Sequence, residues 1–351
     1  MIAEDKPERV RSGEEINLHE LNRYLSAHTP IETLIQQWQF PGGYSNLTYL
    51  LTTASGKEYI LRRPPKGAAI KSAHDMSREY NLLTALQPHY TRIPKPVHLA
   101  EDSTILGSPF YLMERLHGVI LRPSLVKNIQ IAPGEMKAIS EALVDNLVAL
   151  HAIDIHASGL NTIGKPEGYI TRQVDGWTKR YKAAQTDEIK AMEEVGKWLA
   201  ANIPAEHPPT LLHNDYKFDN IVLDEQHLPT IRGVLDWEMA TVGDPWMDLG
   251  ASLAYWAEST DEDLAKVFNV SWLPGNLTRK QVVARYQERS GRQADPVFYY
   301  VFGLFKNAVI AQQIYARWKQ GHSNDPRFGQ LIHVIHNLAG RGRRALDTLS
   351  L

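Results

Sequence analysis

The sequence predicts an α+β fold in which an antiparallel β-sheet lobe is followed by a larger helical lobe. Up to about residue 115, short β-like runs alternate with turn residues, and after Gly118 long segments carry apolar residues at helical spacing. A chain of 351 residues is too long for one small core and suits one two-lobed domain or two domains. We therefore predict an N-lobe over residues 1–115 and a helical C-lobe over residues 116–351.

The N-lobe begins with a predicted helix. Asn17 followed by Glu20 is a capping-box pattern ahead of leucines at helical spacing. The strand-like runs that follow enclose a glycine-rich turn, which favours an antiparallel sheet. The predicted elements are a helix over 17–28, strands over 34–40, 47–53 and 58–62, a helix over 74–87, and strands within 94–101 and 108–118.

The C-lobe is predicted to be mostly helical. Residues 134–154, 169–203 and 277–349 have helical patterns, and a strand-loop-strand segment lies between the second and third of them. The longest uncharged apolar run, 297–305, is far too short to span a bilayer and predicts a buried part of a helix. We therefore expect no membrane interaction.

The composition excludes several kinds of site. The chain has no cysteine, which removes disulfides, zinc–thiolate sites and cysteine nucleophiles and fits a reducing compartment. The first ten residues, MIAEDKPERV, lack the apolar segment of a secretory signal, so we expect a cytoplasmic protein. The 14 histidines show no HExxH-like spacing, and we expect no transition-metal site.

A dense polar cluster, HNDYKFDN, lies at residues 213–220 directly behind two leucines. Asp215 precedes Asn220 by five residues, and Asp236 follows later at the end of an apolar strand. Such oxygen ligands suit Mg²⁺, and a carboxylate beside them can accept a proton from a hydroxyl group. The alternative is a polar surface loop held by Asx turns.

The spacing of this cluster is that of a known catalytic loop. His213, Asp215, Lys217 and Asn220 match H-x-D-x-K-x-x-N, which resembles the protein-kinase superfamily. Together with DWE at 236–238 and GDPWMDL at 243–249, it resembles the aminoglycoside phosphotransferase and choline kinase family. Within that family it is most similar to the kinase-like domains fused to some acyl-CoA dehydrogenases. The resemblance covers roughly residues 32 to 260.

The resemblance implies a bilobal protein-kinase-like fold and an enzyme that transfers the γ-phosphoryl group of ATP to a hydroxyl of a small molecule. It makes Asp215 the catalytic base, and Lys217 the cation that offsets charge on the transferring group. Asn220 and Asp236 would hold Mg²⁺ on the phosphates. The alternative for Lys217 is a solvated lysine. A protein kinase is disfavoured because DWE replaces Asp-Phe-Gly and no Ala-Pro-Glu segment follows.

Four further polar residues are given structural interpretations. We interpret His213 as a scaffold residue and His151 as a packed histidine at a helix end. Asp248 is interpreted as a hydrogen-bond anchor for the backbone of the catalytic loop, with a plain N-terminal helix charge as the alternative. Asp244 has the position of a helix cap.

The nucleotide site is expected in the N-lobe. Glycines in PGGYSN let backbone N–H groups approach phosphates, and Ser45 or Asn46 could add side-chain donors. In the following strand Ile60 would cover the adenine, Arg62 would reach the α- and β-phosphates, and Glu79 would pair with Arg62. The family usually has lysine in place of Arg62, and Arg63 is an alternative for the same role. The residues expected to bind nucleotide are Gly42, Gly43, Ser45, Asn46, Ile60, Arg62, Glu79, and the hinge residues Met113, Glu114 and Leu116.

The acceptor is predicted only by charge and by the resemblance. Residues 277–351 carry a net charge of +8 in a chain of net charge −2. A basic cleft would favour an anionic acceptor such as a hydroxyacyl-CoA, whereas the alternative places these cations on solvated helix faces. The resemblance also implies an acyl-CoA dehydrogenase partner. No nucleic-acid-reading motif accompanies the basic segment. The remaining alternatives are an aminoglycoside kinase and a catalytically silent nucleotide-binding module.

Overall fold

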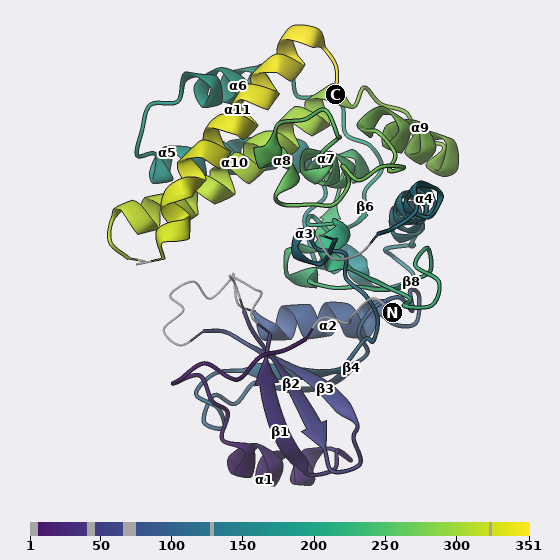
Figure 1. Ribbon diagram of the computed structural model, residues 1–351, viewed down its shortest axis with the longest axis vertical. Coiled ribbons are helices and arrows are strands. Elements are labelled where there is room, and N and C mark those ends of the chain that lie inside the picture. Colours follow the sequence, from purple (N-terminus) through teal and green to yellow (C-terminus); the bar gives the residue numbers. More distant parts are fainter. Residues whose placement is uncertain (1–5, 41–45, 66–74, 127–129, 323–324) are drawn as a thin grey trace. The chain divides into compact units, whose positions relative to one another are not determined.

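The computed structural model describes residues 6–40, 46–65, 75–126, 130–322 and 325–351 (Figure 1). Contacts between residues divide the chain into two compact units. The first unit contains Met1–Ile120 together with Val222–His227 and Arg232–Glu238. The second contains Leu121–Ile221, Leu228–Ile231 and Met239–Leu351. One unit is built on an antiparallel sheet and the other on helices, so the predicted α+β fold is confirmed.

The first unit is a five-stranded antiparallel sheet with a helix on either side (Figure 1). The order in the sheet is β1-β2-β3-β5-β4. Helix α1 starts where Asn17 accepts hydrogen bonds from the N–H groups of His19 and Glu20, as expected for an N-cap. The elements are α1 Leu18–His28, β1 Leu34–Gln39, β2 Leu47–Thr53, β3 Glu58–Arg63, α2 Met76–Leu86, β4 Pro96–Ala100 and β5 Phe110–Glu114.

Both faces of the sheet are buried at its central strand β3, and they have different roles. Side chains alternate along a strand, so neighbours in β3 point to opposite faces. Leu61 belongs to the core that also contains Leu21 and Leu25 of α1. Ile60 and Arg62 therefore lie on the other face, where both are buried. The sheet thus carries an apolar core on the α1 side and a buried charged group on the opposite side.

The second unit surrounds the long helix α10, which packs against α5, α6, α7 and α11 (Figure 1). The run 297–305 is buried within α10, as predicted. In the part of the chain that the structure describes, no helix is both long and apolar enough to cross a membrane. The helices are α3 Pro123–Val126, α4 Pro133–His151, α5 Tyr169–Ala184, α6 Lys190–Ala201, α7 Pro245–Tyr255, α8 Asp263–Lys266, α9 Arg279–Ser290, α10 Val297–Lys319 and α11 Leu331–Thr348.

Short strands carry the polar segments of residues 210–243. Strand β6, Thr210–Leu212, pairs antiparallel with β9, Thr241–Gly243. Strands β7, Ile221–Leu223, and β8, Ile231–Val234, form a second two-stranded sheet. The cluster HNDYKFDN lies between β6 and β7, and the DWE segment follows β8. Each predicted polar motif therefore begins where a buried strand ends.

Helices α7 and α10 approach each other at two glycines. A Cβ atom added to Gly303 would lie 2.3 Å from the carbonyl oxygen of Gly250. One added to Gly250 would lie 2.2 Å from the carbonyl oxygen of Tyr299, so neither position has room for a side chain. This close contact brings the helix turns that carry Asp248 and Lys306 towards the same loop.

Candidate active site

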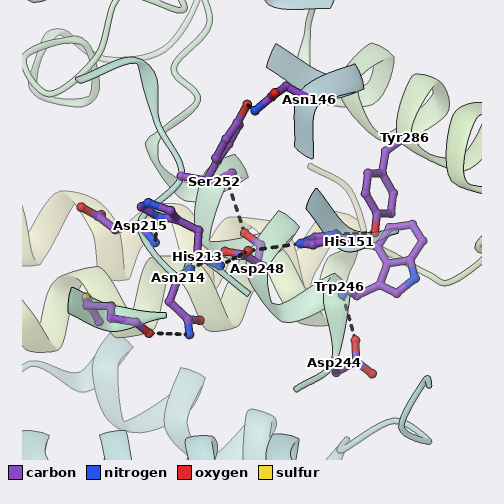
Figure 2. Close-up of polar contacts among 12 residues, drawn as sticks. Asn146, His151, His213, Asn214, Asp215, Asp244, Trp246, Asp248, Ser252 and Tyr286 are labelled. Atoms are coloured by element: carbon purple, nitrogen blue, oxygen red, sulfur yellow. Dashed lines mark hydrogen bonds and ion pairs between the residues drawn. The ribbon is translucent and has the colours of Figure 1, made fainter. Parts of the chain in front are cut away.

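The loop after β6 is anchored by one buried carboxylate, that of Asp248 in α7 (Figure 2). Its two oxygens accept hydrogen bonds from the backbone N–H groups of His213 and Asn214, both at 2.7 Å. The predicted anchor role of Asp248 is confirmed by these contacts. The loop is therefore fixed to α7 directly before Asp215.

His151 completes this anchor from α4. Its Nε2 lies 3.2 Å from Asp248, and its Nδ1 lies 2.8 Å from the Tyr286 hydroxyl (Figure 2). Burial alone would raise the pKa of Asp248, but hydrogen bonds from His151 and from the loop, with the nearby imidazoles, hold it below its ordinary value. His151 is thus more than the packed helix-end residue that we expected, because it connects α4, α7 and α9.

Asn214 adopts a left-handed backbone conformation with φ of 66°. Asparagine tolerates this region better than most residues, although the conformation still requires support from its surroundings. The side-chain amide donates to the carbonyl oxygen of Met239 at 3.1 Å, and its oxygen accepts from the Tyr169 hydroxyl at 3.3 Å. Tyr169 was not predicted, because it lies in a helix far away in the sequence.

Asp215 is held by two residues of its own loop. The Lys217 ammonium lies 3.0 and 2.9 Å from the two carboxylate oxygens. The Asn220 amide donates to the Asp215 carbonyl and to Oδ2, both at 2.9 Å. Because both of these bonds use the Asn220 nitrogen, its side-chain oxygen remains available for a cation. We call Asp215, Lys217 and Asn220 the Asp215 centre.

Lys217 is mostly buried and sits 4.6 Å from the centre of the Tyr255 ring. Burial lowers the pKa of Lys217, but Tyr255 and Asp215 outweigh that effect and raise it above its ordinary value. Burial also raises the pKa of Tyr255 to about 12. Lys217 therefore remains charged beside Asp215. Tyr255 was not predicted, since nothing in its local sequence points to the loop.

The first unit contains a second polar centre around Arg62. Its guanidinium donates to Glu79 at 2.5 Å and to Asp236 at 3.0 Å, and lies 3.5 Å from Glu238. Glu238 also accepts a hydrogen bond from the Asn46 amide at 3.0 Å. We call Arg62, Glu79, Asp236 and Glu238 the Arg62 centre. The pairing of Arg62 with Glu79 agrees with the sequence prediction, whereas the contribution of Glu238 was not foreseen.

The Arg62 centre brings three carboxylates to one guanidinium. Burial opposes the charge on Arg62, yet Glu79, Tyr111 and the other acids raise its pKa well above the ordinary value. Burial raises the pKa of Glu79, and the neighbouring Asp236 adds to this effect. An excess of negative charge at a nearly buried site fits an additional cation.

Asp236 is the residue of this centre best suited to a metal. It has φ of 66°, and its side chain is 36% exposed. Arg62 contacts one carboxylate oxygen, which leaves the second for a hard cation. The described residues contain no group of three or more histidine or carboxylate side chains arranged for a metal. Mg²⁺ does not need such a group, because it keeps several waters and binds phosphate oxygens.

Arg63 points to the opposite face of the sheet from Arg62. Its guanidinium donates to the Tyr49 hydroxyl at 2.9 Å and to the carbonyl oxygens of Glu14 at 2.8 Å and Leu106 at 3.3 Å. These contacts connect the N-terminal segment to the sheet. Because side chains alternate along β3, Arg62 contacts Glu79 and Arg63 does not.

The remaining nucleotide-site predictions fall in three places. Gly42, Gly43 and Ser45 lie outside the described residues. Ile60 and Met113 are opposite each other on β3 and β5, on the same face as Arg62. Further along, the Glu114 N–H donates to the Lys95 carbonyl oxygen at 2.9 Å, and the Leu116 side chain packs against Gly233, where an added Cβ would lie 2.3 Å from it.

The positive charge of residues 277–351 is largely paired within the second unit. Arg285 contacts Asp145 at 2.8 Å, and Arg279 contacts Asp261 at 2.5 Å. Because these cations already have carboxylate partners, the net charge of the segment does not by itself indicate a basic cleft. The cations with carboxylate partners are Arg279, Arg285, Arg289, Lys319, Arg327, Arg341, Arg343 and Arg344.

The chain belongs to the phosphotransferase enzyme family, whose model matches residues 37–283. It is 34% identical to acyl-CoA dehydrogenase family member 10 of Mus musculus over 334 residues. That match covers 91% of this chain but 30% of the relative. The chain spans less than half the length of this and other curated relatives that it matches. The resemblance to kinase-like domains of acyl-CoA dehydrogenases is therefore confirmed.

Solved structures share the fold. A crystal structure from Ralstonia eutropha, provisionally named an aminoglycoside phosphotransferase, superposes with a TM-score of 0.81 at 28% identity. It covers 95% of this chain and 99% of its own. The GDP complex of wild-type aminoglycoside 2'-phosphotransferase-IIIa matches with a TM-score of 0.60 at 12% identity, covering 93% of this chain and 99% of its own. At that identity the likeness shows the protein-kinase-like fold alone.

Proposed function

We propose that this protein is an ATP- and Mg²⁺-dependent phosphotransferase that transfers the γ-phosphoryl group to a hydroxyl of a small molecule. The observation that carries this proposal is the Asp215 centre. A carboxylate held by a lysine and an amide, on a loop anchored through Asp248, can orient a hydroxyl group and accept its proton. Membership of the phosphotransferase family supports the same reaction.

The two polar centres have complementary tasks in this reaction. Arg62, positioned by Glu79, steadies the α- and β-phosphates, and Ile60 covers the adenine at the hinge of Met113, Glu114 and Leu116. The backbone of Gly42 and Gly43, with the side chains of Ser45 and Asn46, receives the phosphates. Asn220 and Asp236 would hold Mg²⁺ through their side-chain oxygens. When bound, that ion would neutralise charge on the phosphate oxygens.

Transfer forms a bond between the acceptor oxygen and the γ-phosphorus and breaks the bond to the β-phosphate oxygen. Asp215 takes the proton of the acceptor hydroxyl, and ADP leaves with the bonding electron pair. The Lys217 ammonium group lies 2.9 Å from Asp215, and it moves towards the γ-phosphoryl group when the nucleotide is present. That change frees a carboxylate oxygen for the acceptor hydroxyl.

For the acceptor we propose an anionic hydroxyl compound, in particular a hydroxyacyl-CoA. The support is the curated relative, an acyl-CoA dehydrogenase by name, which makes an acyl thioester the natural compound class and an acyl-CoA dehydrogenase the natural partner. The charge of residues 277–351 adds little, because most of its cations are paired. The proposed acceptor therefore depends on the similarity to acyl-CoA dehydrogenase family members, whereas the proposed reaction depends on the geometry of the Asp215 centre.

The test is a screen of hydroxylated compounds with ATP and Mg²⁺, read by ³¹P spectroscopy or by a mass increase of one phosphoryl group. Hydroxyacyl-CoA thioesters, hydroxy acids, sugar phosphates and kanamycin form the panel. We expect phosphorylation of anionic members that stops when Mg²⁺ is chelated and in the Asp215→Asn variant. If kanamycin alone is phosphorylated efficiently, the proposed anionic acceptor is wrong and the acceptor is an aminoglycoside. Nucleotide binding without transfer to any member would indicate a silent nucleotide-binding module.

A further inference from the structure

Lys306 occupies an unusual position for a lysine. It lies in the middle of α10, among apolar residues, and is only 4% exposed. Lysine is almost never fully buried unless it is paired, because removing an ammonium group from water is costly. Among the described residues no carboxylate lies within ion-pair distance of its Nζ atom, in contrast to most cations of the 277–351 segment. The proposed reaction as described above does not use it.

The hydrogen bond of Lys306 is made to the catalytic loop. Its Nζ donates to the carbonyl oxygen of Asn214 at 2.7 Å. This oxygen belongs to the peptide group that joins Asn214 to Asp215. At the other end of the same peptide group, the N–H of Asp215 donates to Nδ1 of His213 at 3.2 Å. The peptide group that carries the catalytic base is thus held at both ends.

Lys306 also completes the support of a strained residue. Asn214 has φ of 66°, and its N–H, side-chain nitrogen and side-chain oxygen contact Asp248, Met239 and Tyr169. The carbonyl oxygen is its fourth polar group, and Lys306 occupies it. A left-handed residue other than glycine persists only where the surroundings hold it. Removing one of four contacts therefore favours relaxation of the loop.

The charge of Lys306 has a defined environment as well. Burial lowers the pKa of Lys306, whereas Asp215 and Asp248 act in the opposite direction and Lys217 adds to the lowering. The Trp177 ring lies 5.9 Å from Nζ, within the range of a cation–π contact. The ammonium group is thus placed among the charged groups of the loop and its anchor.

We propose that Lys306 is a positioning residue that holds the Asn214–Asp215 peptide group and thereby aims the Asp215 carboxylate at the acceptor hydroxyl. Its effect on turnover rests on the proposed phosphotransferase reaction. Its effect on the loop does not, because the hydrogen bond to Asn214 exists without any substrate. The two parts can therefore be tested separately.

The test compares Lys306→Met with Lys306→Arg and with a matched control, Arg341→Met. Arg341 is also a buried cation beside α10, with its guanidinium 2.9 Å from the Tyr300 hydroxyl, but within the described part of the chain it has no contact with the loop. Met keeps most of the side-chain volume of Lys306 and removes the donor and the charge. The Arg341 variant reports what the loss of a buried cation does to the unit as a whole.

Amide hydrogen exchange of the peptide covering residues 211–220 is the first measurement. We expect exchange at 213–215 to become at least about tenfold faster in Lys306→Met, with the same segment unchanged in Arg341→Met. The second measurement is steady-state turnover of the acceptor identified in the screen. Here we expect kcat to fall about 100-fold in Lys306→Met with the KM for ATP nearly unchanged, and Lys306→Arg to recover part of the loss.

Two results would overturn the inference. One is unchanged exchange at 213–215 in Lys306→Met, and the other is a kcat no lower than that of Arg341→Met. If the wild-type protein phosphorylates no acceptor, the proposed function fails, and the exchange experiment alone still decides whether Lys306 holds the loop.

Discussion

The Arg62 centre and the Asp215 centre are assembled in opposite ways. The Arg62 centre combines a strand residue, a helix residue and two residues that follow β8, which are separated by up to 176 positions in the chain. The Asp215 centre uses three residues within six consecutive positions. Only its supports, Asp248, His151 and Lys306, come from distant helices. In the Arg62 centre the functional residues themselves are far apart in the sequence. In the Asp215 centre the functional residues are close together, and the residues that support them are far away in the sequence.

The two centres also differ in charge balance. Three carboxylates surround Arg62, whereas the Asp215 carboxylate is paired with Lys217 and lies near Lys306. Each centre nevertheless contains or adjoins one non-glycine residue with φ of 66°, Asp236 in the first and Asn214 beside the second. Strained backbone of this kind is found where surrounding contacts fix a side chain in one direction. In the reaction that we propose, the Arg62 centre would accept the cation and the Asp215 centre would accept the proton.

The largest expected effect comes from Asp215→Asn, which removes the proton acceptor and keeps the shape of the side chain. Turnover should fall about 1,000-fold or more while ATP affinity is retained, because the group acts mainly in the transition state. Single-turnover kinetics and nucleotide titration measure the two quantities. Asp224→Asn, which affects a carboxylate in the following turn, is the control and should retain activity. Equal activity of the two variants would remove Asp215 from the reaction.

An intermediate effect is expected for Arg62→Met, compared with Arg63→Met on the opposite face. Removing Arg62 leaves Glu79 buried without its cation, which costs about 3–5 kcal/mol of unfolding free energy. Arg63 donates to a hydroxyl and to carbonyl oxygens, so its loss should cost about 1–3 kcal/mol. The free energy of unfolding of each variant, measured in urea with and without Mg²⁺ and ATP, distinguishes Arg62→Met from Arg63→Met further. Only the Arg62 variant should lose stabilisation by the nucleotide, and the same loss in both would contradict distinct roles for the two faces.

The smallest effect concerns the anchor, through Asp248→Asn. The folded-state pKa of Asp248 is held below its ordinary value of 3.8, so its contribution to stability is present above about pH 3.8 and is lost as the pH falls through the folded-state pKa. Over that window the wild type should lose up to about 1.4 kcal/mol per pH unit from this group. Urea midpoints between pH 5 and pH 3 measure the slope.

The control for this pH experiment is Asp263→Asn, because Asp263 is an exposed carboxylate on α8. We expect Asp248→Asn to flatten the loss of stability towards low pH and Asp263→Asn to leave it unchanged. An identical pH slope in wild type and Asp248→Asn would mean that the anchor does not contribute through its charge.

Much of the fold could be predicted because local patterns are strong. The predicted bounds of the helix at 17–28, of the strands of the sheet and of the helix at 134–154 lie within a few residues of the observed ones, since capping and apolar spacing are properties of consecutive residues. Residues 169–203 and 277–349 were predicted only as helical segments, and they contain α5 and α6 and, in the second segment, α9, α10 and α11. The loop 213–220 was identified by the spacing of its polar residues, and Asp248 was singled out in a segment that carries the resemblance to the phosphotransferase family. The alternation of β3 also predicted that Ile60 and Arg62 share a face.

Other features could not be found from the sequence. Lys306 lies in a helix whose pattern indicates only burial, and Tyr169, Tyr255 and Glu238 have no local signal that connects them to their partners. The charge of residues 277–351 was misleading as evidence for the acceptor, because a count of charges does not reveal which cations have carboxylate partners.

The sequence by itself determined the chemistry that is available: a carboxylate, an amide and a lysine at fixed spacing behind a buried strand, and an arginine on one face of a sheet. Spacing and alternation are properties of residues that are close together in the sequence, so they can be recognised without the structure. The tertiary structure alone decided which buried charges meet. It brought Lys306 to the Asn214 carbonyl and Glu238 to Arg62, because such contacts depend on helices and strands whose packing joins residues about 90 or more positions apart.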